Sequence, residues 1–152
     1  MEFYSEISPT DLAEISVPGE KQGGVLMKEN KFRLIGCKIN SIYFYSFENR
    51  LLFSIEKNKL SAIKLRQTMA RLLEYLLTNA QERVVSDNEI MMNVWEGYDL
   101  KSSSQRLWQV MENLKSILLK IGVSCYFIMR VNSNGYLIRK DTTLGLYAKS
   151  CD

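Results

Sequence analysis

The segment Ser102–Ile121, with the sequence SSSQRLWQVMENLKSILLKI, divides into an apolar and a polar side when it is placed on a helix. The apolar residues recur at the spacing of one buried helical stripe; they are Leu107, Val110, Met111, Leu114, Ile117, Leu118 and Ile121. Ser102, Ser103 or Ser104 can cap the N-terminus, because each hydroxyl can accept a hydrogen bond from a free backbone N–H. The segment therefore predicts an amphipathic helix with one buried side.

The polar side of this helix is rich in side chains that contact both phosphates and base edges. It carries Gln105, Arg106, Gln109, Glu112, Asn113, Ser116 and Lys120. An ordinary solvated side would consist mostly of Glu and Lys, and for this helix taken alone a plain surface helix is the commoner interpretation. The glutamines, asparagine and arginine nevertheless favour a DNA recognition helix, and the neighbouring segments strengthen that interpretation.

Composition limits the class of protein. The chain has 152 residues, of which 46% are hydrophobic, so it can bury the core of one domain with an additional arm at most. No apolar run approaches the roughly 18 residues that a membrane span needs. Residues 1–16 also lack the basic start and apolar stretch of a secretion signal. We expect a soluble chain.

The residues on which most enzymes and metal sites depend are absent or scattered. Histidine does not occur, and the cysteines lie far apart, at Cys37, Cys125 and Cys151, as is typical of a reducing compartment. This excludes most zinc sites and the Ser–His and Cys–His nucleophiles. Glycine-rich phosphate-binding motifs are missing as well. We therefore expect no enzyme activity, no catalytic residue, no metal ion and no cofactor.

Charge is distributed unevenly along the chain. Residues 1–30 contain six acidic and two basic residues, a net charge of −4, whereas residues 101–140 contain seven basic residues and one acidic residue, a net charge of +6. A basic segment around a polar helix is the electrostatic footprint of a protein that binds the phosphate backbone. A solvated basic surface is the alternative interpretation.

Residues 25–65 are rich in β-branched and aromatic side chains, which favour strands. Strands are expected at Lys31–Ile35, Ser41–Phe47, Leu51–Ile55 and Leu60–Lys64. Between the second and third of these, Glu48, Asn49 and Arg50 have hairpin spacing, with Asn49 as the residue able to take a positive φ. The segment predicts a small antiparallel sheet.

Two helices are expected between this sheet and the recognition helix. Arg66–Asn79 carries an apolar stripe, and the next helix begins at a capping box formed by Ser86 and Glu89. That second helix is expected to end at Gly97. The loop Glu96–Lys101 then leads into the recognition helix.

A hairpin follows the recognition helix: strands at Ser124–Arg130 and Tyr136–Arg139 flank the turn Asn132–Gly135, which tolerates left-handed backbone. The order sheet, three helices, hairpin predicts an α+β fold, a winged helix-turn-helix with an N-terminal antiparallel sheet and a C-terminal β-hairpin wing. In that fold the helix at 102–121 enters the major groove, and the wing at 124–139 contacts the adjacent backbone or minor groove.

Three parts of the chain follow from this assignment. Residues 1–24 form an arm, with a short helix starting at Ser8 and then a linker. Residues 25–140 form the winged-helix DNA-binding domain. Residues 141–152 form a C-terminal tail.

From Leu65 onward the chain resembles the C-terminal effector domain of the OmpR/PhoB family of bacterial transcription regulators. The matching stretches lie within 65–77, 83–95, 107–115 and 131–136, and the preceding sheet extends the resemblance to 32–140. Residues 1–30 leave no room for a phosphorylatable receiver domain, so the layout is similar to the ToxR/CadC branch. The resemblance implies a cytoplasmic location, either as a separate regulator or as the cytoplasmic domain of a longer inner-membrane protein.

The resemblance also implies roles for individual residues. Gln109 and Asn113 fall where the family contacts bases, and both side chains suit adenine. Contacts to the DNA backbone or from the wing are implied at Trp95, Gln105, Lys115, Arg130 and Asn132. Arg106 is added for its charge at the helix start, and Lys120 for its charge on the polar side.

Two departures from the family pattern predict weak binding by a single copy. Glu112 falls where a cation often faces a phosphate, and the wing turn Asn132–Gly135 carries little charge. Affinity would then be recovered by a homodimer on DNA or by tethering. The loop Glu96–Lys101 matches the region that contacts RNA polymerase in some relatives. Double-stranded DNA, RNA polymerase and a second copy are thus the expected partners.

Two functional hypotheses are open from the sequence. The first is a sequence-specific, DNA-binding bacterial transcription regulator without catalysis. The second is a winged helix used for protein–protein interaction without direct DNA binding, which Glu112, the weakly charged wing and the aromatic strand Ile42–Phe47 favour. The second predicts partner binding that is insensitive to substitution of Gln109 and Asn113.

Overall fold

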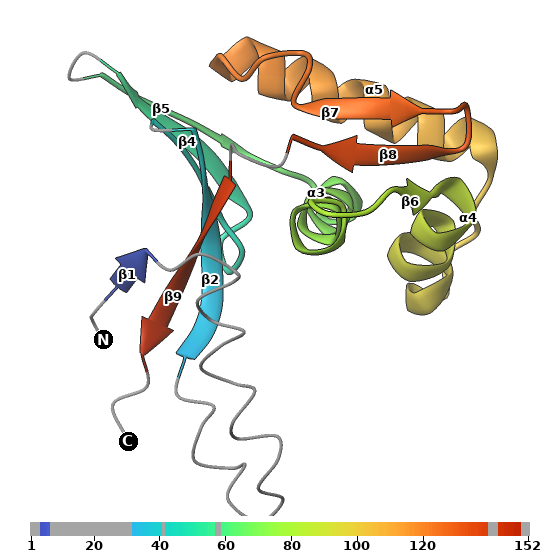
Figure 1. Cartoon of the computed structure of the whole chain (residues 1–152), viewed down its shortest axis with the longest axis horizontal. Coiled ribbons are helices and arrows are strands. Elements are labelled where there is room, and N and C mark those ends of the chain that lie inside the picture. Colours follow the sequence, from blue (N-terminus) through green and yellow to red (C-terminus); the bar gives the residue numbers. More distant parts are fainter. Residues whose placement is uncertain (1–3, 7–31, 41, 57–58, 140–142, 150–152) are drawn as a thin grey trace, which may run out of the picture.

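The computed structural model describes residues 4–6, 32–40, 42–56, 59–139 and 143–149. These residues form two antiparallel sheets with three helical segments between and beside them (Figure 1). The helix predicted to start at Ser8 and the linker after it lie outside the described residues.

The larger sheet confirms the N-terminal antiparallel sheet expected from the sequence. Its strand order is β1-β9-β2-β3-β4-β5. The strands are β1 (Tyr4–Glu6), β2 (Phe32–Ile39), β3 (Tyr43–Ser46), β4 (Leu51–Glu56), β5 (Lys59–Lys64) and β9 (Thr143–Lys149). In the hairpin between β3 and β4 the positive φ falls on Arg50, at 54°, and not on Asn49 as predicted.

Strand β9 corrects the assignment of residues 141–152 to a tail. It lies between β1 and β2, and pairs Gly145 with Cys37 and Thr143 with Ile39. Tyr147 of this strand is buried. The strand is seven residues long and carries Gly145 in its interior, which weakens the sequence signal for a strand. Strand β9 therefore connects β1 to β2 within the larger sheet.

The helical segments are α3 (Gln67–Asn79), α4 (Asp87–Ile90) and α5 (Ser104–Ile121). Helix α4 does not end at Gly97 as predicted. It continues through η2 (Met91–Trp95), a π-helical turn, and η3 (Glu96–Tyr98), a 3-10 turn. The chain turns only at Asp99, which has a φ of 59°. The capping box at the start of α4 is confirmed, because the Ser86 hydroxyl accepts from the Glu89 N–H at 3.1 Å.

The smaller sheet is the wing. It consists of β6 (Val85–Ser86), β8 (Gly135–Ile138) and β7 (Ile128–Val131), in that order. Strand β7 starts four residues later than predicted, because residues 124–127 form a turn. Asn132 and Ser133 both have positive φ, at 50° and 62°, which matches the predicted left-handed turn between β7 and β8.

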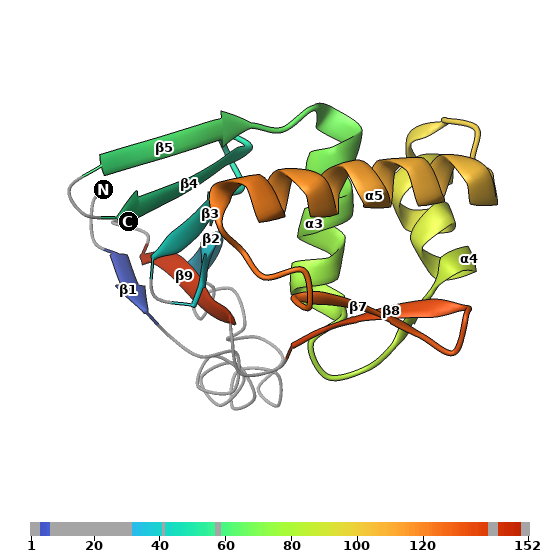
Figure 2. The same ribbon diagram turned by 90° about the horizontal axis from the view of Figure 1, so that it is seen from above.

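The hydrophobic core is formed by side chains of the helices and of both sheets, which pack against one another. Helix α5 buries Leu107, Met111, Leu114 and Leu118, helix α3 buries Leu72, Leu73, Leu76 and Leu77 among others, and the larger sheet adds Ile39, Tyr45 and Leu52. Figure 2 shows α5 running across the molecule above α3, with the β7–β8 hairpin alongside. This packing fixes one side of α5 and leaves the opposite side in solvent.

Candidate nucleic-acid interface

Helix α5 presents the polar side that the sequence predicts. Gln105, Arg106, Gln109, Asn113 and Lys120 are all exposed. Gln105, Gln109 and Asn113 are spaced four residues apart, so they follow one another along the same side of the helix. The structure therefore brings the two predicted base-contacting residues, Gln109 and Asn113, next to a predicted backbone contact.

Both ends of α5 are held in place. At its start the Ser103 hydroxyl accepts from the Arg106 N–H at 3.0 Å, which selects this serine among the three candidate caps. At its end Gly122 has a φ of 117°, and its carbonyl accepts from the Tyr43 hydroxyl at 2.8 Å. A Cβ at Gly122 would lie 2.6 Å from that hydroxyl oxygen. The larger sheet thus fixes the direction of the polar helix.

A cavity of about 450 Å³ separates α5 from the wing. We call it the helix–wing cleft. It is lined by Ser104, Gln105, Leu107, Trp108, Glu112 and Lys115 of α5, by Arg130 and Tyr136 of the wing, and by Asp87. Gln105 and Lys115 were predicted to contact the DNA backbone and Arg130 to contact DNA from the wing, and the structure brings all three to this one cleft.

The Arg130 guanidinium is held by several partners. It donates to the two carboxylate oxygens of Asp87 at 2.6 and 2.9 Å and to the carbonyl of Ser133 at 2.6 Å. The bond to Asp87 raises the pKa of this guanidinium above its usual range. The pair carries no net charge, so Asp87 opposes the attraction between Arg130 and a phosphate. Sequence reasoning missed Asp87, which is 43 residues away in the chain.

Two cations of the cleft lie over the Tyr136 ring. The Arg130 guanidinium carbon lies 4.6 Å from its ring centroid and the Lys115 ammonium nitrogen 5.6 Å from it. Burial raises the pKa of the Tyr136 hydroxyl. The ring therefore contacts both cations where they line the cleft. Asn132 is exposed at the tip of the wing turn.

Trp95 does not lie with the other predicted contacts. Its side chain is 1% exposed and packs in the core, and its indole N–H has no partner among the described residues. An indole at that depth cannot contact a phosphate, so the structure contradicts the predicted contact by its side chain. The physical reason is that the Trp95 side chain belongs to the apolar stripe that α4 and η2 bury.

Trp108 was missed by the sequence analysis. Its side chain is 59% exposed, one residue beyond buried Leu107 on α5. The signal was present in the sequence, because the spacing of the apolar stripe leaves position 108 outside it. An exposed indole on a polar helix is an unusual feature that sequence reasoning should have noted.

The loop predicted at Glu96–Lys101 exposes apolar side chains. Tyr98 and Leu100 are exposed, and so is Met92 of the preceding turn. The Arg71 guanidinium carbon lies 3.5 Å from the Tyr98 ring centroid, and the Ser102 hydroxyl donates to Glu96 at 2.6 Å. The loop is therefore held in a defined shape while its apolar residues face solvent.

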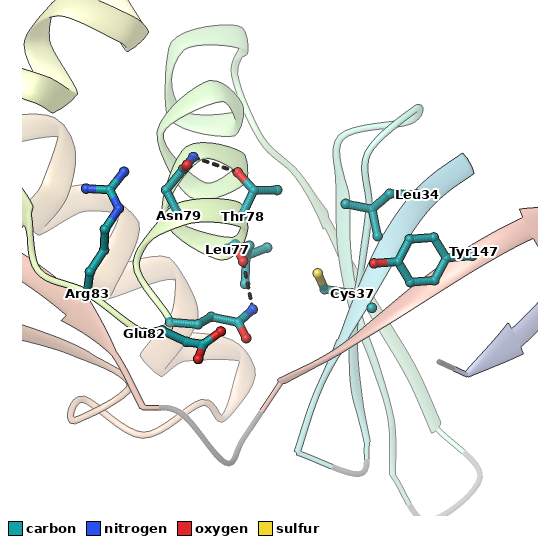
Figure 3. A pocket seen from close by; sticks show the side chains of 10 residues that line it. Leu34, Cys37, Leu77, Thr78, Asn79, Glu82, Arg83 and Tyr147 are labelled. Carbon is teal, nitrogen blue, oxygen red and sulfur yellow. Dashed lines mark hydrogen bonds between the residues drawn. The ribbon is translucent and has the colours of Figure 1, made fainter. Parts of the chain in front are cut away.

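A second cavity lies between the C-terminal end of α3 and the larger sheet (Figure 3). Its polar side chains are engaged locally: the Asn79 amide donates to Thr78 at 2.9 Å, and the Gln81 amide donates to the Leu77 carbonyl at 2.7 Å. Burial raises the pKa of the Cys37 thiol to about 12, so this thiol is not a nucleophile at neutral pH. The described residues contain no cluster of three or more His, Cys, Asp or Glu side chains that could hold a metal ion.

None of the helices in the described part of the chain combines the length and the apolar composition of a membrane-crossing segment.

Residues 60–138, from β5 to the end of the wing, match the family described as "Transcriptional regulatory protein, C terminal". No curated protein shows a significant match to the chain.

Three solved structures share the fold. The C-terminal domain of NsrR, a nisin resistance and lantibiotic response regulator, has a TM-score of 0.53 at 24% identity, covering 65% of this chain and 93% of that one. The DNA-binding domain of the response regulator AdeR, solved with an intercistronic region, has a TM-score of 0.54 at 14% identity, covering 67% of this chain and 98% of that one. The DNA-binding domain of Escherichia coli CadC has a TM-score of 0.54 at 18% identity, covering 70% of this chain and 92% of that one. These similarities confirm the winged helix-turn-helix architecture.

Proposed function

The chain belongs to the family of C-terminal domains of transcriptional regulatory proteins, and from this premise we propose that it binds specific DNA sequences by inserting α5 into the major groove. The observation that carries the proposal is the exposed polar side of α5, fixed at both ends and bordered by a wing. The wing then contacts the adjacent backbone or minor groove. The DNA-binding unit extends to 149, because β9 is part of its sheet.

Within α5 the roles divide by chemistry. Gln109 and Asn113 contact base edges, and the paired donor and acceptor of each amide suits adenine. Gln105, Arg106, Lys115 and Lys120 contact phosphates, and Arg130 and Asn132 do so from the wing. The cationic members of this set supply affinity that depends on salt, whereas the two amides supply discrimination between sequences.

Two further partners follow from the same surface. The exposed apolar residues Met92, Tyr98 and Leu100 support a contact with RNA polymerase through the loop after η2. A second copy bound to a neighbouring half-site would compensate for the few phosphate contacts that one copy makes. We infer a cytoplasmic location from these proposed interactions, and none of them needs a catalytic step.

The direct test is fluorescence anisotropy of the full chain on a random duplex, titrated across salt. Three cations of α5, Arg106, Lys115 and Lys120, face the proposed DNA side, and Arg130 is not counted because Asp87 cancels its charge. Each neutralised phosphate contributes about −0.9 to the slope of log K against log salt, so a slope of about −2.7 is expected.

Matched variants localise the contact. Substituting Arg106 and Lys120 together by Ala should make the slope less steep by about 1.8. Substituting Arg33 by Ala, an exposed cation on β2 of the larger sheet, should leave the slope unchanged. A wild-type protein that binds no duplex at low salt would instead favour the protein–protein interaction hypothesis, with Met92, Tyr98 and Leu100 as the contact surface.

A further inference from the structure

We propose that Trp108 and Glu112 form a pyrimidine-contacting pair on α5, with the Trp108 indole packed against a thymine methyl group and the Glu112 carboxylate accepting from a cytosine amino group. This inference rests on the proposed DNA-binding function. It assigns bases to residues that are neither among the amides of the polar side nor among its phosphate-binding cations.

The two side chains are neighbours that face the helix–wing cleft. Both line that cleft, and they are one helical turn apart at positions i and i+4. The helix rises 1.5 Å per residue, so their Cα atoms are separated by about 6 Å along its axis, roughly the rise of one to two base steps. They can therefore contact two nearby bases on one strand.

The carboxylate of Glu112 is available for a base. It is exposed, and no ion pair or hydrogen bond of its side chain is found within the described ranges. Neither cation of the cleft pairs with the Glu112 carboxylate, since Arg130 binds Asp87 and Lys115 lies beside the Tyr136 ring. A carboxylate beside a phosphate would weaken binding, whereas the cytosine N4 amino group is the base-edge donor that a carboxylate accepts from.

The indole of Trp108 is available for an apolar contact. Its 59% exposure leaves a large hydrophobic surface in solvent, in a cleft whose other lining side chains are mostly polar or charged. In the major groove the C5 methyl group of thymine is the apolar feature that distinguishes one base. Burial of that methyl group against the ring would therefore add both affinity and discrimination.

The test starts from a duplex that the full wild-type chain selects from a random library. Each thymine of this duplex is then replaced, one at a time, by deoxyuridine, which lacks the methyl group. At one position the replacement should lower wild-type affinity about four-fold, the equivalent of one methyl-sized group. Trp108→Ala should be insensitive to the replacement at that position, and Trp108→Phe should recover part of the sensitivity. Tyr126→Ala, which removes another exposed aromatic side chain, should behave as wild type.

The second arm compares selected sequences. Glu112→Gln should lose the preference for cytosine at one position and gain adenine there, because a glutamine amide pairs with adenine. Glu82→Gln, at another exposed acid, should select the wild-type sequence. A wild-type protein that selects no sequence overturns the proposed function itself. If the wild-type protein does select a sequence, but Trp108→Ala keeps the wild-type sensitivity to deoxyuridine and Glu112→Gln keeps the wild-type base preferences, only the proposed pair is overturned.

Discussion

Substituting Asp87 by Asn should strengthen binding to every DNA duplex. Asp87 holds the Arg130 guanidinium through two hydrogen bonds, at 2.6 and 2.9 Å, and cancels its charge at the wing. The amide keeps the size of the side chain and one acceptor, so Arg130 stays in place while the negative charge is removed. The wing then presents one more net positive charge to the phosphates.

The size of the effect follows from counting charges. One additional neutralised phosphate makes the slope of log K against log salt steeper by about 0.9. Across a change from roughly 50 to 200 mM salt, this corresponds to about a 3.5-fold additional change in affinity. The ion pair is largely at the surface, with side-chain exposures of 37% and 25%, so its loss should cost about 1 kcal/mol of stability or less.

Anisotropy titrations on one duplex at several salt concentrations measure this slope. Arg130→Ala alone should weaken binding, because Asp87 is then left facing the DNA, and the double variant Asp87→Asn, Arg130→Ala should recover much of that loss. The matched control is Glu89→Gln, which removes the negative charge from the comparable two-bond pair between Arg83 and Glu89, at 2.9 and 2.6 Å. Arg83 lines the other cavity, so the slope should not change.

The reasoning would be refuted by an unchanged slope in Asp87→Asn, together with an Arg130→Ala variant that binds as tightly as wild type. That pair of results would place Arg130 away from the DNA and leave it as a residue that only fixes the wing to α4.

Three other predictions follow from the same structure. Lys115→Ala should weaken binding to all duplexes to a similar extent, because we propose that its ammonium contacts phosphate; anisotropy on several sequences checks this, and a loss confined to one sequence would contradict it. Leu114→Ala should lower the free energy of unfolding by about 2–5 kcal/mol in urea denaturation, since this side chain of α5 is completely buried. Hydrogen bonds from Arg83 and Tyr75 lower the pKa of Glu89 from 4.5 to about 2, so its contribution to stability should be complete above pH 4.5 and be lost as the pH falls toward 2. Thermal melting against pH should show this decline in wild type and a shallower one in Glu89→Gln, whereas equal declines would refute the assignment.

The local signals of the sequence were sufficient for most of the fold. The apolar stripe of α5, the capping box at Ser86 and the left-handed turn at Asn132 are properties of a few neighbouring residues, and the structure confirms each of them. Strand β9 could not be predicted in the same way, because its place between β1 and β2 depends on pairing across more than a hundred residues.

The sequence could predict which residues of the candidate interface form its polar side, but not which side chains bind one another there. Helical spacing alone places Gln109 and Asn113 in solvent. Spacing could not show that Arg130 is bound to Asp87, because the two residues meet only when the wing packs beside α4. Trp95 shows the converse: a match to a family position implied a contact, whereas burial in the core removes its side chain from the surface.

The central claim is that α5 distinguishes DNA sequences through Gln109 and Asn113. The most direct test is to measure the affinity of the double variant Gln109→Ala, Asn113→Ala on the selected duplex and on a random duplex, with Asn49→Ala, an exposed amide on the β3–β4 turn, as the control. We expect a loss of about 1–3 kcal/mol for each amide on the selected duplex, with little change on the random one. Equal losses on both duplexes, or no loss on either, would contradict the claim.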